Sequence, residues 1–134
     1  MEPEKVKCVL LADRHQGLVE GVRGLLETTF QAVVMVADEA SLFESARRLR
    51  PTLAVVDLSL VRAQSLQWLK RFRGLYPDLK LIVLSVHDEP GVRHSAMDSG
   101  ADGFVLKRTL ATDLLPAVDA VLAGKRYGWT KDEA

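Results

Sequence analysis

Short apolar segments alternate with longer amphipathic segments along the whole chain. The apolar segments are dense in β-branched residues, which is typical of strands covered on both faces in a parallel sheet. They comprise residues 6–12, 32–37, 53–56, 81–86 and 104–106. The segments between them have apolar residues at helical spacing, as at Leu18, Val22, Leu25 and Leu26. The pattern therefore predicts strands and helices in strict alternation.

Residues that begin and end helices lie where this pattern changes. Ser41 and Glu44 form a capping box, which predicts the start of the second helix. Pro77 ends the third helix, Pro90 suits the first turn of the fourth, and Gly100 follows the fourth as a C-terminal cap. Five strands and five helices in alternation, joined by right-handed crossovers, predict an α/β fold with a doubly wound, five-stranded parallel sheet.

Length and charge narrow the class of protein. The 134 residues, 48% hydrophobic and 27% charged, predict one domain over residues 1–126, with residues 127–134 as a C-terminal tail or the start of a linker. The net charge of +0 argues against direct nucleic-acid binding. One cysteine, Cys8, excludes an intramolecular disulfide. The longest apolar run is too short to span a membrane, and the charged N-terminus lacks a signal core, so we expect a cytoplasmic protein.

Four of the predicted strands are followed or closed by a polar residue. These residues are Asp13, Asp57, Ser85 and Lys107. Because parallel strands present their carboxyl ends at one edge of the sheet, the four side chains should meet there. A carboxylate can accept a phosphoryl group covalently, and a lysine and a hydroxyl can stabilise the phosphoryl oxygens. The set predicts phosphoryl chemistry.

Over residues 6–127 the sequence resembles a response-regulator receiver domain of the two-component systems. The resemblance rests on Leu-Leu-Ala-Asp-Arg-His at 10–15, Val-Val-Asp-Leu-Ser-Leu at 55–60, Val-Leu-Ser-Val-His-Asp at 83–88 and Ser-Gly-Ala-Asp-Gly-Phe-Val-Leu-Lys at 99–107. The sequences of these motifs are most similar to those of the NarL/FixJ subfamily. The resemblance implies a CheY-like sheet of order 2-1-3-4-5 and a role in a phosphorelay.

The resemblance also implies a role for each matching residue. Asp57 matches the phospho-acceptor, Ser85 the switch hydroxyl, Lys107 the family's lysine, and Phe104 the aromatic residue that changes rotamer on activation. Simpler interpretations stand beside these: Phe104 as a core residue and Ser85 as a local hydrogen-bonding partner at a strand end. His15 and His87 are expected to be solvated loop residues.

The acidic pair departs from the family pattern. The resemblance assigns Mg²⁺ to Asp13, Asp57 and the backbone carbonyl of Ser59, but Arg14 replaces the second acid of the pair. Two unit charges about 4 Å apart interact by up to roughly 4 kcal/mol at an effective dielectric of about 20, so an Arg14 side chain inside the site should weaken metal binding severely. If Arg14 turns into solvent the loss is smaller, but one oxygen ligand is still missing. We hypothesise that Arg14 donates a charge-assisted hydrogen bond to Asp57.

A second departure follows the acceptor strand. Val61 stands where the family usually has a proline, and with Arg62 it suggests an altered loop. The loop after Asp57 is therefore expected to differ from that of typical members.

The sequence thus predicts an atypical receiver domain, not an enzyme beyond self-phosphotransfer, with Asp57 as its phospho-acceptor. The alternative is a pseudo-receiver that is never phosphorylated and acts as a protein-interaction module. A phosphatase-like enzyme is disfavoured, because Ser59 stands where such an enzyme needs a second acid. By resemblance, the donor is a histidine kinase or phosphotransfer protein. The output partner, or a second copy, would bind the fourth helix, the fifth strand and the fifth helix.

Overall fold

A computed structural model describes residues 6–61 and 66–128 of the chain. Five parallel strands form one sheet of order β2-β1-β3-β4-β5, as predicted. The strands are β1 (Val6–Ala12), β2 (Phe30–Val36), β3 (Leu53–Asp57), β4 (Lys80–Ser85) and β5 (Gly103–Leu106). The α-helices are α1 (Gln16–Leu26), α2 (Glu39–Leu49), α3 (Gln67–Leu75), α4 (Pro90–Asp98) and α5 (Leu110–Leu122), with 3-10 turns η1 (Leu58–Leu60) and η2 (Lys107–Thr109).

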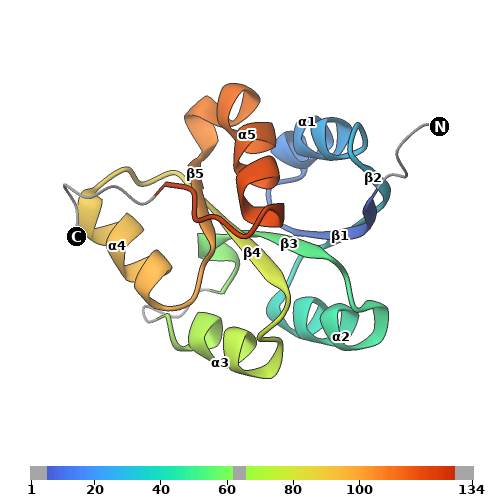
Figure 1. Ribbon diagram of the computed structural model, residues 1–134, viewed down its shortest axis with the longest axis horizontal. Coiled ribbons are helices and arrows are strands. Elements are labelled where there is room, and N and C mark those ends of the chain that lie inside the picture. Colours follow the sequence, from blue (N-terminus) through green and yellow to red (C-terminus); the bar gives the residue numbers. More distant parts are fainter. Residues whose placement is uncertain (1–5, 62–65, 129–134) are drawn as a thin grey trace.

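Helices cover both faces of the sheet, with α1 and α5 on one side and α2, α3 and α4 on the other (Figure 1). Successive residues of each central strand enter opposite layers. In β1, Leu10 packs with the α2–α3–α4 layer, whereas Leu11 packs with the α1–α5 layer. Both are almost fully buried, which explains why the strand is apolar throughout.

Within the described part of the chain, no helix is long and apolar enough to cross a membrane.

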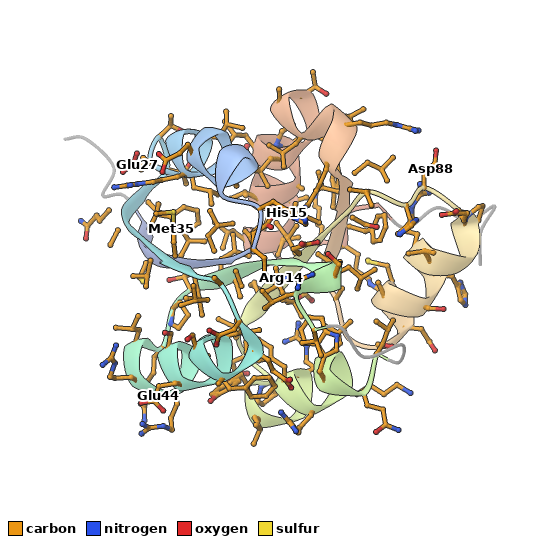
Figure 2. All side chains as sticks on the ribbon, turned by 180° about the vertical axis from the view of Figure 1, so that it is seen from behind. Arg14, His15, Glu27, Met35, Glu44 and Asp88 are labelled. Atoms are coloured by element: carbon orange, nitrogen blue, oxygen red, sulfur yellow. The ribbon has the colours of Figure 1, made fainter. Side chains whose placement is uncertain are left out.

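Two local expectations are wrong. The sequence predicts that the segment forming β2 is buried on both faces, but β2 is an edge strand. Met35, labelled in Figure 2, lies on this strand. Its exposed fraction is 39%. The capping box at Ser41 and Glu44 does not begin α2. Asp38 caps this helix, since its carboxylate accepts a 2.7 Å hydrogen bond from the Ser41 amide, and the helix begins at Glu39.

Arg73 joins the end of α3 to the opposite end of the sheet from the predicted site. Its guanidinium donates to the carbonyls of Gly100 at 2.9 Å and Leu79 at 2.5 Å, and to the Asp102 carboxylate at 2.6 Å. The same Asp102 oxygen accepts the Leu81 amide at 2.9 Å. One side chain therefore connects α3, the start of β4 and the turn before β5.

Residues 125–128, which we call the C-terminal strap, lie along the outer edge of β5. The Phe104 amide donates to the Tyr127 carbonyl, and the Tyr127 amide to the Asp102 carbonyl, each at 3.0 Å. Arg126 adds a 2.8 Å bond to the Met97 carbonyl at the end of α4. In Figure 1 the strap is the red segment that leaves α5 and passes β5 toward α4. Tyr127 and Gly128 are thus attached to the sheet.

We predict that Gly128→Ala releases the strap without unfolding the domain. Gly128 has a φ of 91°, and a Cβ there would lie 2.7 Å from the Phe104 carbonyl oxygen. Gly124→Ala is the matched control, because Gly124 has a φ of 85° but open space around its Cβ position. In a hydrogen-exchange experiment, the Phe104 amide should exchange quickly in Gly128→Ala and remain protected from exchange in Gly124→Ala. Equal protection in both variants would contradict this role of Gly128.

Candidate functional site

The register of the sheet brings the predicted site residues together at its carboxyl edge. Ala12 pairs with Val56, so Asp13 and Asp57 follow directly on neighbouring strands. Ser85 pairs with Leu106, so Lys107 follows beside it. The side chains of Asp13 and Asp57 are almost wholly buried. The expectation that these residues meet at one edge is correct.

Lys107 pairs with both acids at once. Its ammonium nitrogen lies 3.0 Å from Oδ2 of Asp13 and 3.2 Å from Oδ2 of Asp57, and the lysine side chain is only 7% exposed. Two carboxylates this close would repel each other in a dry environment, and the ammonium between them offsets that repulsion.

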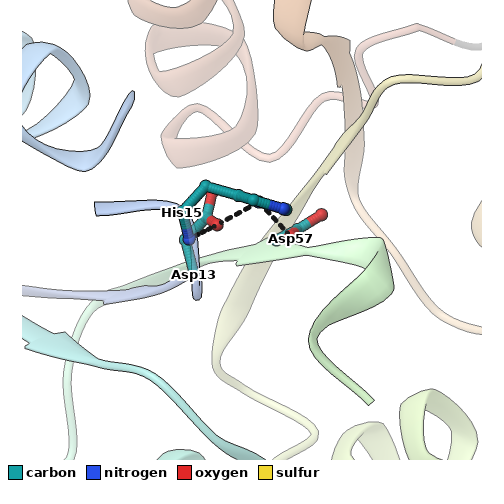
Figure 3. Close-up of side chains that lie close together, drawn as sticks. All are labelled: Asp13, His15 and Asp57. Atoms are coloured by element: carbon teal, nitrogen blue, oxygen red, sulfur yellow. Dashed lines mark hydrogen bonds and ion pairs between the residues drawn. The ribbon is translucent and has the colours of Figure 1, made fainter. Parts of the chain in front are cut away.

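His15 also belongs to this cluster, and the expectation of a solvated loop residue was incomplete. Its Nδ1 lies 3.0 Å from Oδ1 of Asp13 and 3.4 Å from Oδ2 of Asp57 (Figure 3). The same nitrogen lies 3.2 Å from Nζ of Lys107, although the His15 side chain is 55% exposed. The His15 amide donates to Asp13 at 2.8 Å, which forms an Asx turn. That spacing of two residues after a strand-ending Asp is the sequence signal that identifies His15.

The environment of Asp13 shifts its acidity. Burial alone would raise the pKa of this carboxyl group, but the His15 amide and the Lys107 ammonium stabilise the carboxylate more strongly and hold its pKa below the ordinary value. Asp13 is therefore an anion at neutral pH.

Asp57 and Ser59 repeat the Asx-turn geometry at the end of β3. The Ser59 amide donates to Oδ1 of Asp57 at 3.1 Å, and the Ser59 hydroxyl donates to Oδ2 at 2.9 Å. With Lys107 and His15 nearby, Oδ2 already has three polar neighbours. Asp57 is held in one orientation at the start of η1.

Arg14 does not bond Asp57, so that hypothesis is wrong in its partner. Its Nη2 donates to the backbone carbonyl of Ser59 at 3.3 Å. The acceptor positions of Asp57 are occupied by closer donors, which leaves the neighbouring carbonyl as the partner for the guanidinium. Figure 2 shows Arg14 and His15 close to each other on the loop after β1.

The predicted switch residues lie near this cluster but make other contacts. The Ser85 hydroxyl accepts the His87 amide at 2.9 Å and is 3.2 Å from the His87 carbonyl, which is the local hydrogen bonding anticipated for a strand end. Phe104 is only 3% exposed and belongs to the core, with the Arg93 guanidinium carbon 5.7 Å from its ring centroid. Neither residue is oriented toward Asp57 by a direct bond in this state.

A groove of about 1170 Å³ opens beside Asp57, between η1, α3 and α4. Arg14, Asp57, Ser85 and Lys70 are among the residues that line it. The Asp57 side chain therefore forms part of the wall of this groove. Val61 lies on its wall, whereas Arg62, the other residue of the expected altered loop, lies outside the described residues.

The donor set at this edge differs from a magnesium shell. Asp13, His15 and Asp57 offer three ligand atoms that lie within 4.8 Å of one another. Mg²⁺ prefers oxygen ligands in octahedral geometry, but one of these donors is an imidazole nitrogen. The Ser59 carbonyl already accepts from Arg14, and Lys107 contacts both carboxylates. The residues present do not fit Mg²⁺ well.

A doubly wound sheet that holds buried acids and a lysine at its carboxyl edge defines a class of signalling domain, the receiver. Comparison with known families gives the same class. The chain belongs to the response regulator receiver domain family, whose model matches residues 9–119. It is thus a receiver domain of the two-component response regulators.

The curated relatives are regulators of the NarL type. The chain is 30% identical to the transcriptional regulatory protein DegU of Brevibacillus brevis over 92% of its length, and that alignment covers 52% of DegU. It is 32% identical to a probable transcriptional regulatory protein NarL of Mycobacterium tuberculosis, with 87% of this chain and 55% of that protein covered. The chain spans about half the length of the curated relatives that it matches.

Solved receiver structures have the same fold. A two-component response regulator of the LuxR family from Aurantimonas sp. SI85-9A1 superposes with a TM-score of 0.84 at 25% identity, covering 97% of this chain and 93% of that one. The non-phosphorylated receiver domain of RcsB from Escherichia coli gives a TM-score of 0.82 at 26% identity, covering 92% of this chain and 98% of that one. The CheY-like fold expected from the sequence is confirmed.

Proposed function

We propose that this receiver domain accepts a phosphoryl group at Asp57 from a histidine kinase or a phosphotransfer protein. The observation that carries the proposal is the placement of the Asp57 carboxylate, which lines the open groove while Lys107 lies 3.2 Å from its Oδ2 atom. A fixed carboxylate beside a fixed ammonium has the elements of a phosphoryl acceptor site.

The transfer would proceed by direct displacement. A carboxylate oxygen of Asp57 forms a bond to phosphorus as the bond from phosphorus to the donor atom breaks, and the donor leaves with that electron pair. Lys107 would neutralise charge on the phosphoryl oxygens. Ser85 would turn its hydroxyl from His87 to one of these oxygens, and this movement would open space for a rotamer change of Phe104.

We further propose that Mg²⁺ is at most weakly held in this domain. Asp13, Asp57 and the Ser59 carbonyl are the predicted ligands, and each is already paired with Lys107 or Arg14. Because the formal charges of Asp13, Asp57, Arg14 and Lys107 sum to zero, a divalent cation would gain less here than at an acidic site.

The same pairing favours a second candidate, the pseudo-receiver that binds partners without being phosphorylated. When both carboxylates are already paired with Lys107, the site is stable in one state without a phosphoryl group.

In either case the proposed docking surface for an output partner or a second copy is α4–β5–α5, along which the C-terminal strap is bonded to β5. The names of the relatives support transcriptional control as the output.

Intact mass after incubation with acetyl phosphate and Mg²⁺ tests the acceptor function. We expect the mass of one added phosphoryl group on the unmodified chain and none on Asp57→Asn, since the amide is not a nucleophile of this kind. The matched control is Asp98→Asn, a change at an exposed carboxylate at the end of α4 that should leave the adduct unchanged. An adduct that persists in Asp57→Asn would contradict Asp57 as the acceptor. No adduct on the unmodified chain would favour the pseudo-receiver.

A further inference from the structure

Arg14 lies where the resemblance placed a metal ligand, and its guanidinium contacts a group assigned to the metal. Nη2 donates to the Ser59 carbonyl at 3.3 Å, and Ser59 in turn donates twice to Asp57. Arg14 and Asp57 line the same groove. A permanent side-chain cation therefore lines the same groove as the Asp57 carboxylate.

The guanidinium also has unused donor capacity. Its Nε atom is buried and has no hydrogen-bond acceptor among the residues that the structure describes. A buried donor left unpaired is unfavourable, so an acceptor that arrives beside it stabilises the bound state. A phosphoryl group entering the groove supplies oxygens of this kind, and arginine binds such oxygens with its planar fork of donors.

We infer that Arg14 supplies the positive charge that a divalent cation provides in the family, so that Asp57 is phosphorylated without a metal. This inference rests on the proposed acceptor function of Asp57. It adds that the reaction does not depend on Mg²⁺ and that Arg14, with Lys107, stabilises the transferred group. The poor fit of the donor set to Mg²⁺ and the position of Arg14 point to the same conclusion.

With acetyl phosphate as the donor, the reaction is a direct transfer of the phosphoryl group to Asp57. The Asp57 oxygen forms a bond to phosphorus, the bond between phosphorus and the acetyl oxygen breaks, and acetate leaves with the electron pair. No proton and no redox partner are needed. During transfer negative charge spreads over three phosphoryl oxygens, and two fixed cations, Arg14 and Lys107, are available to stabilise it.

The test compares the rate of adduct formation in EDTA and in Mg²⁺, measured by intact mass. The unmodified chain should react at the same rate in both. Arg14→Ala should lose about 100-fold in both, as expected for loss of one charged donor to the transition state. The rate for Arg14→Lys should fall between the rates for the unmodified chain and Arg14→Ala. Arg14→Asp should react slowly in EDTA and faster in Mg²⁺. Arg71→Ala, which alters an exposed arginine paired with Glu39, is the control and should behave as the unmodified chain.

Calorimetric titration with Mg²⁺ gives a readout that does not depend on the reaction. We expect saturable binding to Arg14→Asp and none to the unmodified chain, because the variant replaces a cation with an oxygen ligand.

The possible failures are distinguishable. An unmodified chain that forms the adduct only with Mg²⁺ would overturn this inference and leave Asp57 as the acceptor. Equal rates for Arg14→Ala and the unmodified chain in EDTA would overturn the role of Arg14. No adduct on the unmodified chain in either solution would overturn both the acceptor function and this inference.

Discussion

Lys107→Met is expected to lower the free energy of unfolding by about 3–5 kcal/mol near neutral pH, the range typical of removing one partner from a buried ion pair. Methionine keeps the length of the side chain but removes the charge. Asp13 and Asp57 would then remain buried, close together and without the ammonium that lies within 3.2 Å of both. Chemical denaturation, followed by the fluorescence of the two tryptophans, measures the loss.

The deficit of Lys107→Met should shrink as the pH falls. In the unmodified chain the pKa of Asp13 lies below its ordinary value, so this group stabilises the fold above its unfolded pKa and loses that effect as the pH falls through the folded pKa. Without Lys107, repulsion and burial should raise a carboxyl pKa of the pair above the unfolded value. The native state then binds more protons than the unfolded state, so stability rises on acidification from neutral pH.

Lys125→Met is the control, since Lys125 is exposed and lies in the strap, away from the acids. It should change stability by less than about 0.5 kcal/mol, as surface substitutions usually do. A deficit for Lys107→Met that is constant or widens between neutral and acidic pH would contradict the paired-acid site.

Arg73→Ala should destabilise the protein by about 3 kcal/mol or more, because hydrogen bonds that involve a charged group contribute roughly 1.5–3 kcal/mol each. The change removes the bonds to Gly100 and Leu79 and leaves the Asp102 carboxylate without its cation. Arg73 and Asp102 are 22% and 29% exposed, so solvent screens the pair only in part. Thermal unfolding should occur roughly 10–15 °C lower.

Arg73→Lys should not restore this stability, since one ammonium cannot replace a planar fork that reaches several acceptors. The matched control is Arg71→Ala on the same helix, where an exposed pair with Glu39 and a contact with the Phe43 ring are lost. Exposed pairs contribute at most about 1 kcal/mol. A loss in Arg73→Ala no larger than that in Arg71→Ala would show that Arg73 does not fasten α3 to the sheet.

The fold and the central acids could be predicted because both depend on periodicity. Uninterrupted apolar strands require cover on two faces, and parallel strands bring the residues at their carboxyl ends to one edge. Asp13, Asp57 and Lys107 are therefore placed by the positions at which the apolar segments stop. The contacts at this edge confirm that argument.

The details that the sequence did not predict depend on local side-chain geometry. The partner of Arg14 was missed because the choice between a carboxylate and the next carbonyl is a matter of a few ångströms. The contact of His15 with the acids does not follow from the sequence, because an exposed ring can still direct one nitrogen at buried carboxylates. Asp38, and not the predicted Ser41, caps α2, because several residues before a helix can compete for the same amides.

The C-terminal strap has a consequence for how the protein avoids self-association. An open strand edge presents unpaired amides and carbonyls to any other chain, and it is a common starting point for sheet-to-sheet aggregation. At this edge, the Phe104 amide of β5 and the carbonyl of Asp102, the residue just before the strand, are already bonded to Tyr127. The glycine that follows leaves no side chain between strap and strand, so the two backbones pack closely. The strap thus acts as a guard on this edge, and chains shortened before Tyr127 should aggregate more readily.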